Sequence, residues 1–527
     1  MTLPPWPKDR PLRAWQLDAV ERLSAHTGTS FLASATPAAG KTTFGLRVAH
    51  DMLSSGRVKR VVVAGPTTHI CRQWALAAAR VGIDLEPNRP NGDGAEPSDL
   101  HGVAVTYQTI ASGPRIHALA ASRRPTLLIA DEPHHMGDQA SWGVAARTAF
   151  DGAAFRLLLS GTPFRSDNSA IPWVDYDNDG MSRADHTYGY PQALIDRVCR
   201  PITFLPYDGE MEWRSDGRLR SANFETVLPR AEDARRLRTA LEADGDWMGE
   251  VLEDADEKLT DVRDEGHAEA GGLVICSDQE HARAVAARLM RITGEKPEIV
   301  MSDEPEGSAR IARFAEGRRR WLVSVLMVSE GVDIPRLRVG VYATPARTEL
   351  FFRQVVGRFI RRTPAPARQM SYLLLPADIR LKRLAHEIED ERRHALELMN
   401  GAEDEELEER AERTPAGVAF EALSSSGQLE GTIMSGTALQ LFATEDPEPV
   451  KASRGRSESA DATFVSREKL RDQRAYLVSE LSRKRREPHS RVQSWVNNQT
   501  GATSVKAATR EQLEKGNALL VRQLTGR

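Results

Sequence analysis

The sequence predicts an α/β protein with two tandem parallel-sheet domains followed by a helical C-terminal region. The 527 residues exceed what one hydrophobic core supports. Short apolar runs of strand length alternate with helical stretches, and this alternation occurs twice along the chain. Beyond the second series the chain becomes charged and helical. We expect αβ domains at 1–198 and 199–377, a charged helical extension at 378–444, a flexible linker at 445–465 and a basic helical region at 466–527.

The first αβ series contains strands that are apolar throughout. The expected strands are 61–64, 103–106, 127–130 and 156–159, with helices such as 42–55 and 69–80 between them. Strands buried on both faces read as continuous apolar runs, and helices between them place the strands parallel. The following segment, 166–200, is rich in Asp, Tyr and Pro and is expected to be an irregular connection.

A second αβ series follows an acidic helical stretch at 229–265. The expected strands are 272–276, 322–326, 339–343 and 371–375. A heavily charged helical stretch at 380–413 comes next, and the segment 445–465 has few apolar residues, as is typical of a linker.

Composition excludes several protein classes. Hydrophobic residues make up 40% and charged residues 28%, which is ordinary for a soluble globular protein. No apolar run approaches the roughly 18 residues of a membrane span, and the N-terminus lacks an apolar signal core, so we expect a cytoplasmic protein without a membrane partner. Cys71, Cys199 and Cys276 are far apart, which predicts neither a disulfide framework nor a zinc site.

The charge is uneven although the formal net charge is only −4. Residues 451–527 contain 17 Lys and Arg against 8 Asp and Glu. A basic tail on an acidic body indicates a polyanion partner or, alternatively, a solvated helical face.

The segment Ala35-Thr36-Pro37-Ala38-Ala39-Gly40-Lys41-Thr42 has the context of a phosphate-binding loop. It follows the apolar stretch FLASA and precedes a helix, so backbone N–H groups at the helix start would cradle a phosphate. Lys41 would reach the β- and γ-phosphate oxygens of ATP, and the Thr42 hydroxyl would bind Mg²⁺. The nucleotide-binding set is Pro37, Ala38, Ala39, Gly40, Lys41, Thr42 and Thr43. Ala38 stands where glycine is common, which questions nucleotide affinity.

The sequence Asp131-Glu132-Pro133-His134 directly follows the apolar run LLIA, about 90 residues after Lys41. A carboxylate at a strand's end holds Mg²⁺, while its neighbour positions the attacking water. We assign the metal to Asp131, with Thr42, and the water to Glu132. His134 would couple the nucleotide state to the neighbouring domain.

These motifs and those around them resemble the superfamily 2 helicases, specifically the DExH branch that includes restriction-enzyme motor subunits. The resemblance runs from about residue 11 to residue 376 and implies two RecA-like domains. The first-half motifs are Leu12-Arg13-x-Trp15-Gln16, Gly65-Pro66-Thr67-Thr68 with Gln73-Trp74, Thr106-Tyr107-Gln108-Thr109 and Ser160-Gly161-Thr162-Pro163. Within this family an Ala at position 35 is ordinary, whereas Ala38 remains a departure.

The resemblance implies a role for each of these motifs. Arg13 and Gln16 would contact the nucleotide, with Gln16 on the adenine edge. Ser160 and Thr162 would couple hydrolysis to domain movement. The residues expected to contact the nucleic-acid backbone are Pro66, Thr67, Thr68 and Thr106.

The second half carries two further motifs in the family's order. Ser329-Glu330-Gly331-Val332-Asp333-Ile334-Pro335 matches the fifth and Gln354-x-x-Gly357-Arg358-x-x-Arg361 the sixth. The resemblance places Gly331, Asp333 and Gln354 at the nucleotide. Transferred phosphoryl charge requires cations, so Arg361 would act as an arginine finger with Arg358 on the γ-phosphate. Because the two arginines are three residues apart on an expected helix, we expect them to share a face.

The resemblance implies an ATP-dependent helicase or translocase, and three partner hypotheses stay open. The DEPHH and TPAAGKT forms favour DNA over RNA as the partner. An RNA helicase is one alternative, and a nucleotide-gated nucleic-acid clamp without unwinding is another. The intact Glu132 and both arginines argue against the clamp.

The remaining features bear on partners. The aromatic side chains of 166–228 either stack on bases or, as we prefer, pack between the lobes. The run Arg483-Lys484-Arg485-Arg486 either binds nucleic acid or an acidic partner surface, or is a solvated helical face. Thr509 with Gln512 predicts a helix capping box. We find no nuclease signature, which leaves room for a partner protein such as a nuclease or a replication or repair factor.

Overall fold

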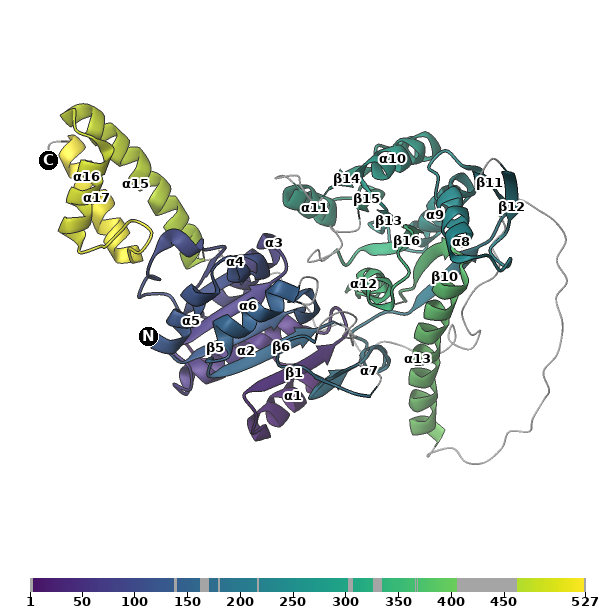
Figure 1. Cartoon of the computed structure of the whole chain (residues 1–527), viewed down its shortest axis with the longest axis horizontal. Coiled ribbons are helices and arrows are strands. Elements are labelled where there is room, and N and C mark those ends of the chain that lie inside the picture. Colours follow the sequence, from purple (N-terminus) through teal and green to yellow (C-terminus); the bar gives the residue numbers. More distant parts are fainter. Residues whose placement is uncertain are drawn as a thin grey trace. The chain divides into compact units, whose positions relative to one another are not determined.

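A computed structural model describes residues 3–136, 140–161, 170–178, 181–215, 218–301, 307–325, 334–364, 366, 368–404 and 462–525. Internal contacts divide the chain into two compact units (Figure 1). The first unit contains Met1–Ala35, Gly40–Thr187 and Ser453–Arg527, and the second contains Thr36–Ala39 and Tyr188–Ala452. Most of the expected linker at 445–465, and the extension beyond residue 404, lie outside the described residues.

The first unit is built on a seven-stranded sheet with the order β3-β4-β2-β5-β6-β1-β9. The strands are β1 (Ser30–Ala35), β2 (Arg60–Gly65), β3 (Leu85–Pro87), β4 (Gly102–Thr106), β5 (Thr126–Asp131), β6 (Phe155–Ser160) and β9 (His186–Tyr188). All the pairs from β3 to β1 are parallel. The four strands predicted for this half are therefore confirmed.

Helices cover both faces of this sheet because the strand side chains are apolar on both faces. The helices are α1 (Ala14–Ala25), α2 (Lys41–Ser54), α3 (Thr68–Ala79), α4 (Tyr107–Ser112), α5 (Pro114–Arg123) and α6 (Ala140–Phe150). On one face, Val62, Leu128 and Leu158 of the strands pack against Ile110 of α4 and Phe150 of α6.

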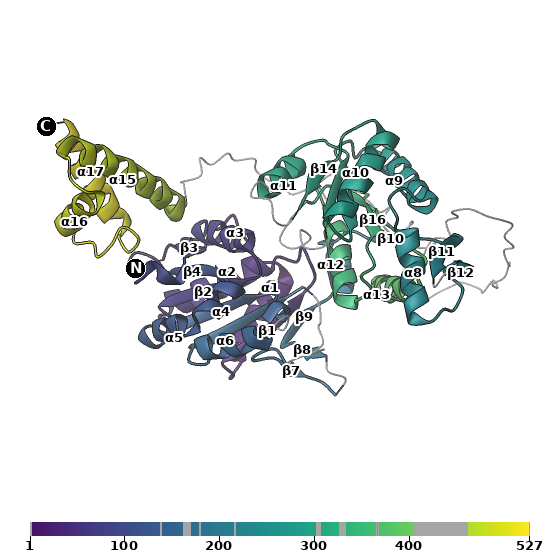
Figure 2. The ribbon, with the colours of Figure 1, turned by 45° about the horizontal axis from the view of Figure 1, so that its top comes forward.

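The described parts of the segment 166–200, residues 170–178 and 181–200, contain more regular structure than expected. They include β7 (Asp175–Tyr176), β8 (Ser182–Arg183), β9 and the short helix α7 (Tyr190–Ile195), and β7 and β8 form a small antiparallel pair (Figure 2).

The aromatic side chains of 166–228 are engaged in packing and hydrogen bonds. Trp173 and Tyr176 pack against the core of the first sheet, while Tyr188, Tyr190 and Trp213 are buried and hydrogen-bonded through their side chains. These contacts support packing over base stacking, and each lies within the unit that carries the residue.

The second unit contains a six-stranded sheet with the order β10-β17-β16-β13-β15-β14, and every neighbouring pair is parallel. The strands are β10 (Ile202–Tyr207), β13 (Gly271–Cys276), β14 (Glu298–Val300), β15 (Trp321–Val325), β16 (Leu337–Ala343) and β17 (Ser371–Pro376). The predicted α/β architecture of two parallel sheets is therefore confirmed. A hairpin of β11 (Met211–Ser215) and β12 (Arg218–Ala222) adds to its core through Trp213 and Ala222.

Helices of the second unit cover its sheet and extend from it. The helices are α8 (Arg230–Ala240), α9 (Asp246–Asp264), α10 (Gln279–Thr293), α11 (Gly307–Glu316), α12 (Glu349–Phe359) and α13 (Ile379–Asp404). Val251 and Leu252 of α9 and Val285 of α10 pack on Val274 and Val323 of the sheet. The charged stretch predicted to be helical corresponds to α13 as far as Asp404.

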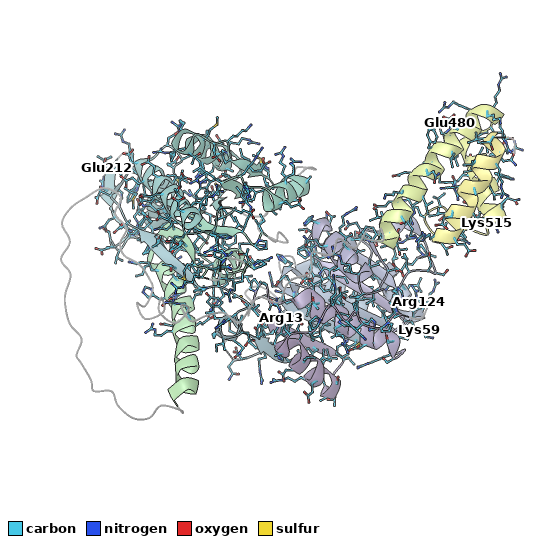
Figure 3. The ribbon with its side chains drawn as sticks, turned by 180° about the vertical axis from the view of Figure 1, so that it is seen from behind. Arg13, Lys59, Arg124, Glu212, Glu480 and Lys515 are labelled. Atoms are coloured by element: carbon cyan, nitrogen blue, oxygen red, sulfur yellow. The ribbon has the colours of Figure 1, made fainter. Side chains whose placement is uncertain are left out.

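The C-terminal region folds into three helices, α15 (Thr463–Arg485), α16 (His489–Thr500) and α17 (Arg510–Thr525) (Figure 3). Their small core contains Leu477, Leu481, Val496 and Leu520. The predicted capping box is confirmed: Thr509 N donates to Gln512 Oε1 at 2.9 Å, and Gln512 N donates to Thr509 Oγ1 at 3.2 Å. Across the described part of the chain, no helix is both long and apolar enough to cross a membrane.

Candidate nucleotide-binding site

The site lies at one edge of the first sheet, where three adjacent parallel strands end. The order β5-β6-β1 places the end of β5 at Asp131, the end of β6 at Ser160 and the loop after β1 side by side. Parallel α/β sheets bind ligands outside the carboxyl ends of their strands. The topology therefore brings together the two motifs that the sequence separates by about 90 residues.

The loop after β1 has a backbone that glycine would adopt most easily. Gly40 has φ +93° and caps the N-terminus of α2, and Ala38 has φ +68°. An L side chain in this left-handed region costs about 1–2 kcal/mol. Ala38, which stands where glycine is common in such loops, therefore has a strained backbone. Lys41, Thr42 and Thr43 form the first turn of α2 and are half-buried.

Gln16 of α1 is held against this loop. Its Nε2 donates to the Gly40 carbonyl at 2.9 Å, and its Oε1 accepts from the Arg13 backbone N–H at 2.8 Å. A Cβ on Gly40 would lie 2.8 Å from Gln16 Nε2 and 3.8 Å from Arg13 Nη1. The structure therefore places Arg13 and Gln16 beside the phosphate loop.

Glu132 is the centre of the polar contacts at the site. Lys41 Nζ lies 2.8 Å from its Oε1, while the Gly161 N–H donates to its Oε2 at 2.9 Å and Ser160 Oγ at 3.3 Å. Burial alone would raise the pKa of Glu132, but the Lys41 ammonium, His134 and the Gly161 N–H together outweigh burial and hold the pKa well below its usual range. Glu132 has a φ of +54°, a strained backbone that is typical of functional sites.

Gly161 lies close to two charged groups. A Cβ at this position would lie 2.8 Å from Lys41 Nζ and 3.0 Å from Glu132 Oε1. A larger residue would require the end of the Lys41 or Glu132 side chain to shift. The glycine of the Ser160-Gly161 motif is therefore part of the site.

Asp131 is held by two aromatic side chains. Trp74 Nε1 donates to its Oδ2 at 2.8 Å, and the Tyr107 hydroxyl donates to its backbone carbonyl at 2.8 Å. Burial and the neighbouring Glu132 raise the pKa of the Asp131 carboxyl above its usual range, against the opposing influence of Lys41. A carboxylate that is costly to bury as an anion is well suited to bind a cation.

The residues present fit a Mg²⁺ ion. Magnesium is bound through one or two carboxylates together with phosphate oxygens and water, and hydroxyl oxygen is a suitable ligand. Asp131 supplies a carboxylate and Thr42 a hydroxyl at the same sheet edge. These two residues would hold the metal, which would neutralise phosphate charge when bound.

His134 lies next to the acidic pair in the short helix Pro133–Met136. It is buried, and its Nδ1 lies 3.6 Å from Glu132 Oε2. Its ring packs against His135 with 4.3 Å between centroids. His134 thus contacts the carboxylate that we assign to water activation.

The threonines expected to contact nucleic acid lie at the same edge, at the ends of β2 and β4. Thr67 caps α3 by accepting the Ile70 N–H at 3.3 Å, and Thr106 caps α4 by accepting the Thr109 N–H at 3.1 Å. Pro66 is half-buried and Thr68 is exposed. The Thr67 cap uses an oxygen lone pair, so this hydroxyl retains its proton for a further acceptor. Thr106 is buried, and its hydroxyl also shares a hydrogen bond with Thr109 Oγ1 at 3.0 Å.

The remaining candidates belong to the second unit. Gln354 and Arg358 lie on α12, and both side chains are half-buried. The expectation that Arg358 and Arg361 share a helical face is wrong, because α12 ends at Phe359 and Arg361 forms an antiparallel bridge with Cys199. The other candidates, Thr162, Gly331 and Asp333, lie outside the described residues.

Comparison with known proteins identifies the family. Residues 9–165 match the family model "Type III restriction enzyme, res subunit". The chain is 44% identical to "Uncharacterized protein Rv2917" of Mycobacterium tuberculosis, over 83% of this chain and 74% of that protein. It is 46% identical to "Uncharacterized protein ML1624" of Mycobacterium leprae, over 73% of this chain and 65% of that protein. The chain belongs to the family of these mycobacterial proteins, among the helicase-like proteins of superfamily 2.

The fold of this helicase-like chain is similar to a solved structure. That structure is a fragment of a protein assigned as the HsdR subunit of a type I restriction enzyme from Vibrio vulnificus, with a TM-score of 0.51 and 19% identity. The similarity covers 72% of this chain and 66% of the other. At this identity the likeness concerns the fold, and it agrees with two RecA-like lobes.

Two residues of the site were not identified from the sequence as site residues. Trp74 was grouped with a nucleic-acid motif, yet it is buried and donates to Asp131. Tyr107 was likewise placed in a nucleic-acid motif, yet its hydroxyl binds the Asp131 backbone. The sequence offered one indication of their role. Trp74 and Tyr107 each follow a strand whose end lies at the same sheet edge as Asp131.

Proposed function

We propose that this protein is an ATP hydrolase of the helicase or translocase type, with DNA as its nucleic-acid partner. The observation that carries the proposal is the cluster of Lys41, Glu132 and Gly161 beside Asp131 at the ends of adjacent parallel strands. A phosphate-binding lysine, a metal-binding carboxylate and a water-positioning carboxylate are the groups that phosphoryl transfer requires.

In this proposal the first unit binds the nucleotide and prepares the attacking water. The Lys41 ammonium has three donors, so it can contact phosphate oxygens while it remains near Glu132. Thr42 and Asp131 would hold Mg²⁺, and Glu132 would position the attacking water. Its lowered pKa keeps it anionic at neutral pH.

The second unit supplies the cations of the transition state. We assign Arg361 as the arginine finger and Arg358 as its partner on the γ-phosphate, with Gln354, Gly331 and Asp333 at the nucleotide. An arginine brought to the transferred phosphoryl group accelerates hydrolysis by several orders of magnitude. Movement of one unit against the other during the cycle would then translate the chain along a strand.

The choice of DNA is supported by the match to a restriction-enzyme subunit over residues 9–165. Pro66, Thr67, Thr68 and Thr106 would grip phosphates without reading bases, so sequence preference should be weak and affinity strongly salt-dependent. Steady-state ATPase rates with single-stranded DNA, duplex DNA and RNA, each at two salt concentrations, test the assignment. Stimulation by RNA alone would establish the RNA helicase instead.

A matched pair of variants separates hydrolysis from folding. Glu132→Gln should abolish DNA-stimulated hydrolysis while ATP binding persists. Glu96→Gln is the control, because Glu96 is also a largely buried carboxylate of the first unit and pairs with Arg60 and Arg124 instead of Lys41. It should lower thermal stability and leave hydrolysis per folded molecule unchanged. Equal loss of activity in both variants would contradict the role of Glu132.

The same variant distinguishes a motor from a nucleotide-gated clamp. If hydrolysis drives release, Glu132→Gln should remain on DNA in the presence of ATP, whereas the wild type should dissociate. A clamp that does not hydrolyse ATP predicts that the wild type and Glu132→Gln dissociate from DNA in the same way when ATP is present.

A further inference from the structure

The helices α15, α16 and α17 carry two sets of basic residues that are engaged differently. The first set contacts acidic residues of the αβ part of the same unit. Arg467 Nη1 lies 2.8 Å from Asp99 Oδ1, Arg471 Nη1 lies 2.7 Å from Glu86 Oε1, and Lys506 pairs with Asp93. This end of the bundle is therefore neutralised by ion pairs.

The second set gathers at the other end of the bundle. We call the exposed residues at the end of α15, the start of α16 and the end of α17 the distal basic surface. Its members are Arg483, Lys484, Arg485, Arg486, His489, Arg491 and Arg522. Eighteen residues of continuous helix separate Arg467 from Arg485, which is about 27 Å. The nearby acidic residues of the same helices and their connection are Glu480 and Glu487.

Part of this surface has a structural role. Arg483 lies 2.7 Å from Glu480, and Lys484 Nζ donates to the carbonyl groups of Gln523 and Leu524 at the end of α17. Arg485 donates to Gln523 Oε1 and lies over the Trp495 ring. Cations at helix C-termini also interact favourably with the helix dipole.

Of the other members, Arg486 and Arg522 lie at the C-terminal ends of α15 and α17, where a cation is favoured, whereas Arg491 is not explained by helix stability. Arg486, Arg491 and Arg522 are exposed, and the described part of the chain shows no hydrogen bond or ion pair for their side chains. Arg491 lies in the first turn of α16, which contains no acidic residue. A cation at a helix N-terminus opposes the helix dipole, whereas an anion is favoured there. A bound anion next to Arg491 would reverse this penalty.

We propose that the distal basic surface binds the phosphate backbone of nucleic acid. Three helix ends bring together at least six permanently positive side chains and two carboxylates. No single segment of the sequence contains all of these positive side chains. Such a surface fits a polyanion with repeated phosphates and contacts no base edges, so binding should be independent of sequence. The choice of nucleic acid rests on the proposed function.

The contacts at the opposite end of the bundle give this surface a function in the motor. Arg467, Arg471 and Lys506 anchor the bundle to the unit that carries Lys41 and Glu132. A second nucleic-acid grip on the same unit raises the local concentration of the strand for the first. Loss of the distal surface should therefore weaken binding and leave the basal ATPase unchanged.

The test uses the full-length chain with Arg486→Ala, Arg491→Ala and Arg522→Ala combined. Affinity for a fluorescent single-stranded DNA is measured by anisotropy over a range of salt concentrations. The matched control combines Arg230→Ala, Arg238→Ala and Arg313→Ala, three exposed arginines of α8 and α11. Both variants lose three charges, so a general effect of net charge would appear in both.

Affinity should fall between about 50 and 200 mM salt in both the wild type and the distal variant, and the loss of three phosphate contacts should make this fall about 20-fold smaller in the variant than in the wild type. The control should keep the wild-type salt dependence, and all three proteins should share one melting temperature and one DNA-free ATPase rate.

Unchanged affinity and salt dependence in the distal variant would overturn this inference and favour an acidic protein surface as its partner. DNA stimulation of the ATPase in the wild type would then still uphold the proposed function. Reduced affinity in the distal variant without any stimulation in the wild type would uphold the distal surface and refute the motor.

Discussion

Trp74 provides the most specific prediction about the metal-binding carboxylate. Its indole N–H donates to Asp131 Oδ2 at 2.8 Å, and the ring is buried. The bond fixes one oxygen of the carboxylate that we assign to the metal. Trp74→Phe removes the donor and keeps an aromatic ring, so the carboxylate loses its orientation.

The magnitude follows from the kind of bond that is lost. A hydrogen bond to a charged group contributes about 1.5–3 kcal/mol, and residues that orient a metal ligand typically affect metal affinity or activity by about 10- to 100-fold. We expect the Mg²⁺ concentration for half-maximal ATPase activity to rise by about that factor. The assay is a Mg²⁺ titration of the steady-state ATPase at saturating ATP and DNA.

Trp321→Phe is the matched control for this prediction. Trp321 is equally buried and its Nε1 donates to Asp256 Oδ1 at 2.7 Å, in the second unit. Both variants should lose similar stability, since each loses an indole bond to a carboxylate. Only Trp74→Phe should change the Mg²⁺ dependence. An unchanged Mg²⁺ titration for Trp74→Phe, or the same shift in both variants, would refute the role of Trp74.

Three further predictions concern single side chains. Ala38→Gly should raise the free energy of unfolding by about 0.5–1 kcal/mol, because glycine adopts φ +68° without strain; a lowered melting temperature would contradict this. Burial and Arg60 lower the pKa of His117 to about 4 from 6.5, so stability should be full above 6.5 and fall by at most about 3 kcal/mol toward pH 4. Urea unfolding of His117→Gln should show a smaller loss over that range. Arg361→Ala should reduce the hydrolysis rate by about 10³-fold or more, and a normal rate would exclude it as the finger.

The sequence identified those parts of the fold that have a strong local signal. Buried parallel strands are continuous apolar runs, which is why β2, β5, β13 and β17 were predicted close to their observed bounds. The three-residue strand β3 was missed because a short edge strand has too few residues to show a pattern. Tertiary pairing determines such strands.

The residues of the candidate site can also be divided into those with a local sequence signal and those without one. Lys41 and Asp131-Glu132 were identifiable because each motif follows an apolar strand, and parallel topology then brings their ends together. Trp74 was not identified, since it is 57 residues from the carboxylate it binds and only the packed sheet joins them. The end of α12 before Arg361 was also beyond prediction, because its bridge to Cys199 is a long-range contact.

The measurement that tests the central claim most directly is single-turnover ATP hydrolysis by wild-type protein and Glu132→Gln, with saturating single-stranded DNA and ATP binding measured in parallel. We predict DNA-stimulated hydrolysis by the wild type, and a rate about 10²- to 10⁴-fold lower for the variant with ATP binding retained. Hydrolysis by Glu132→Gln at the wild-type rate, or a wild type that binds ATP without hydrolysing it, would contradict the account.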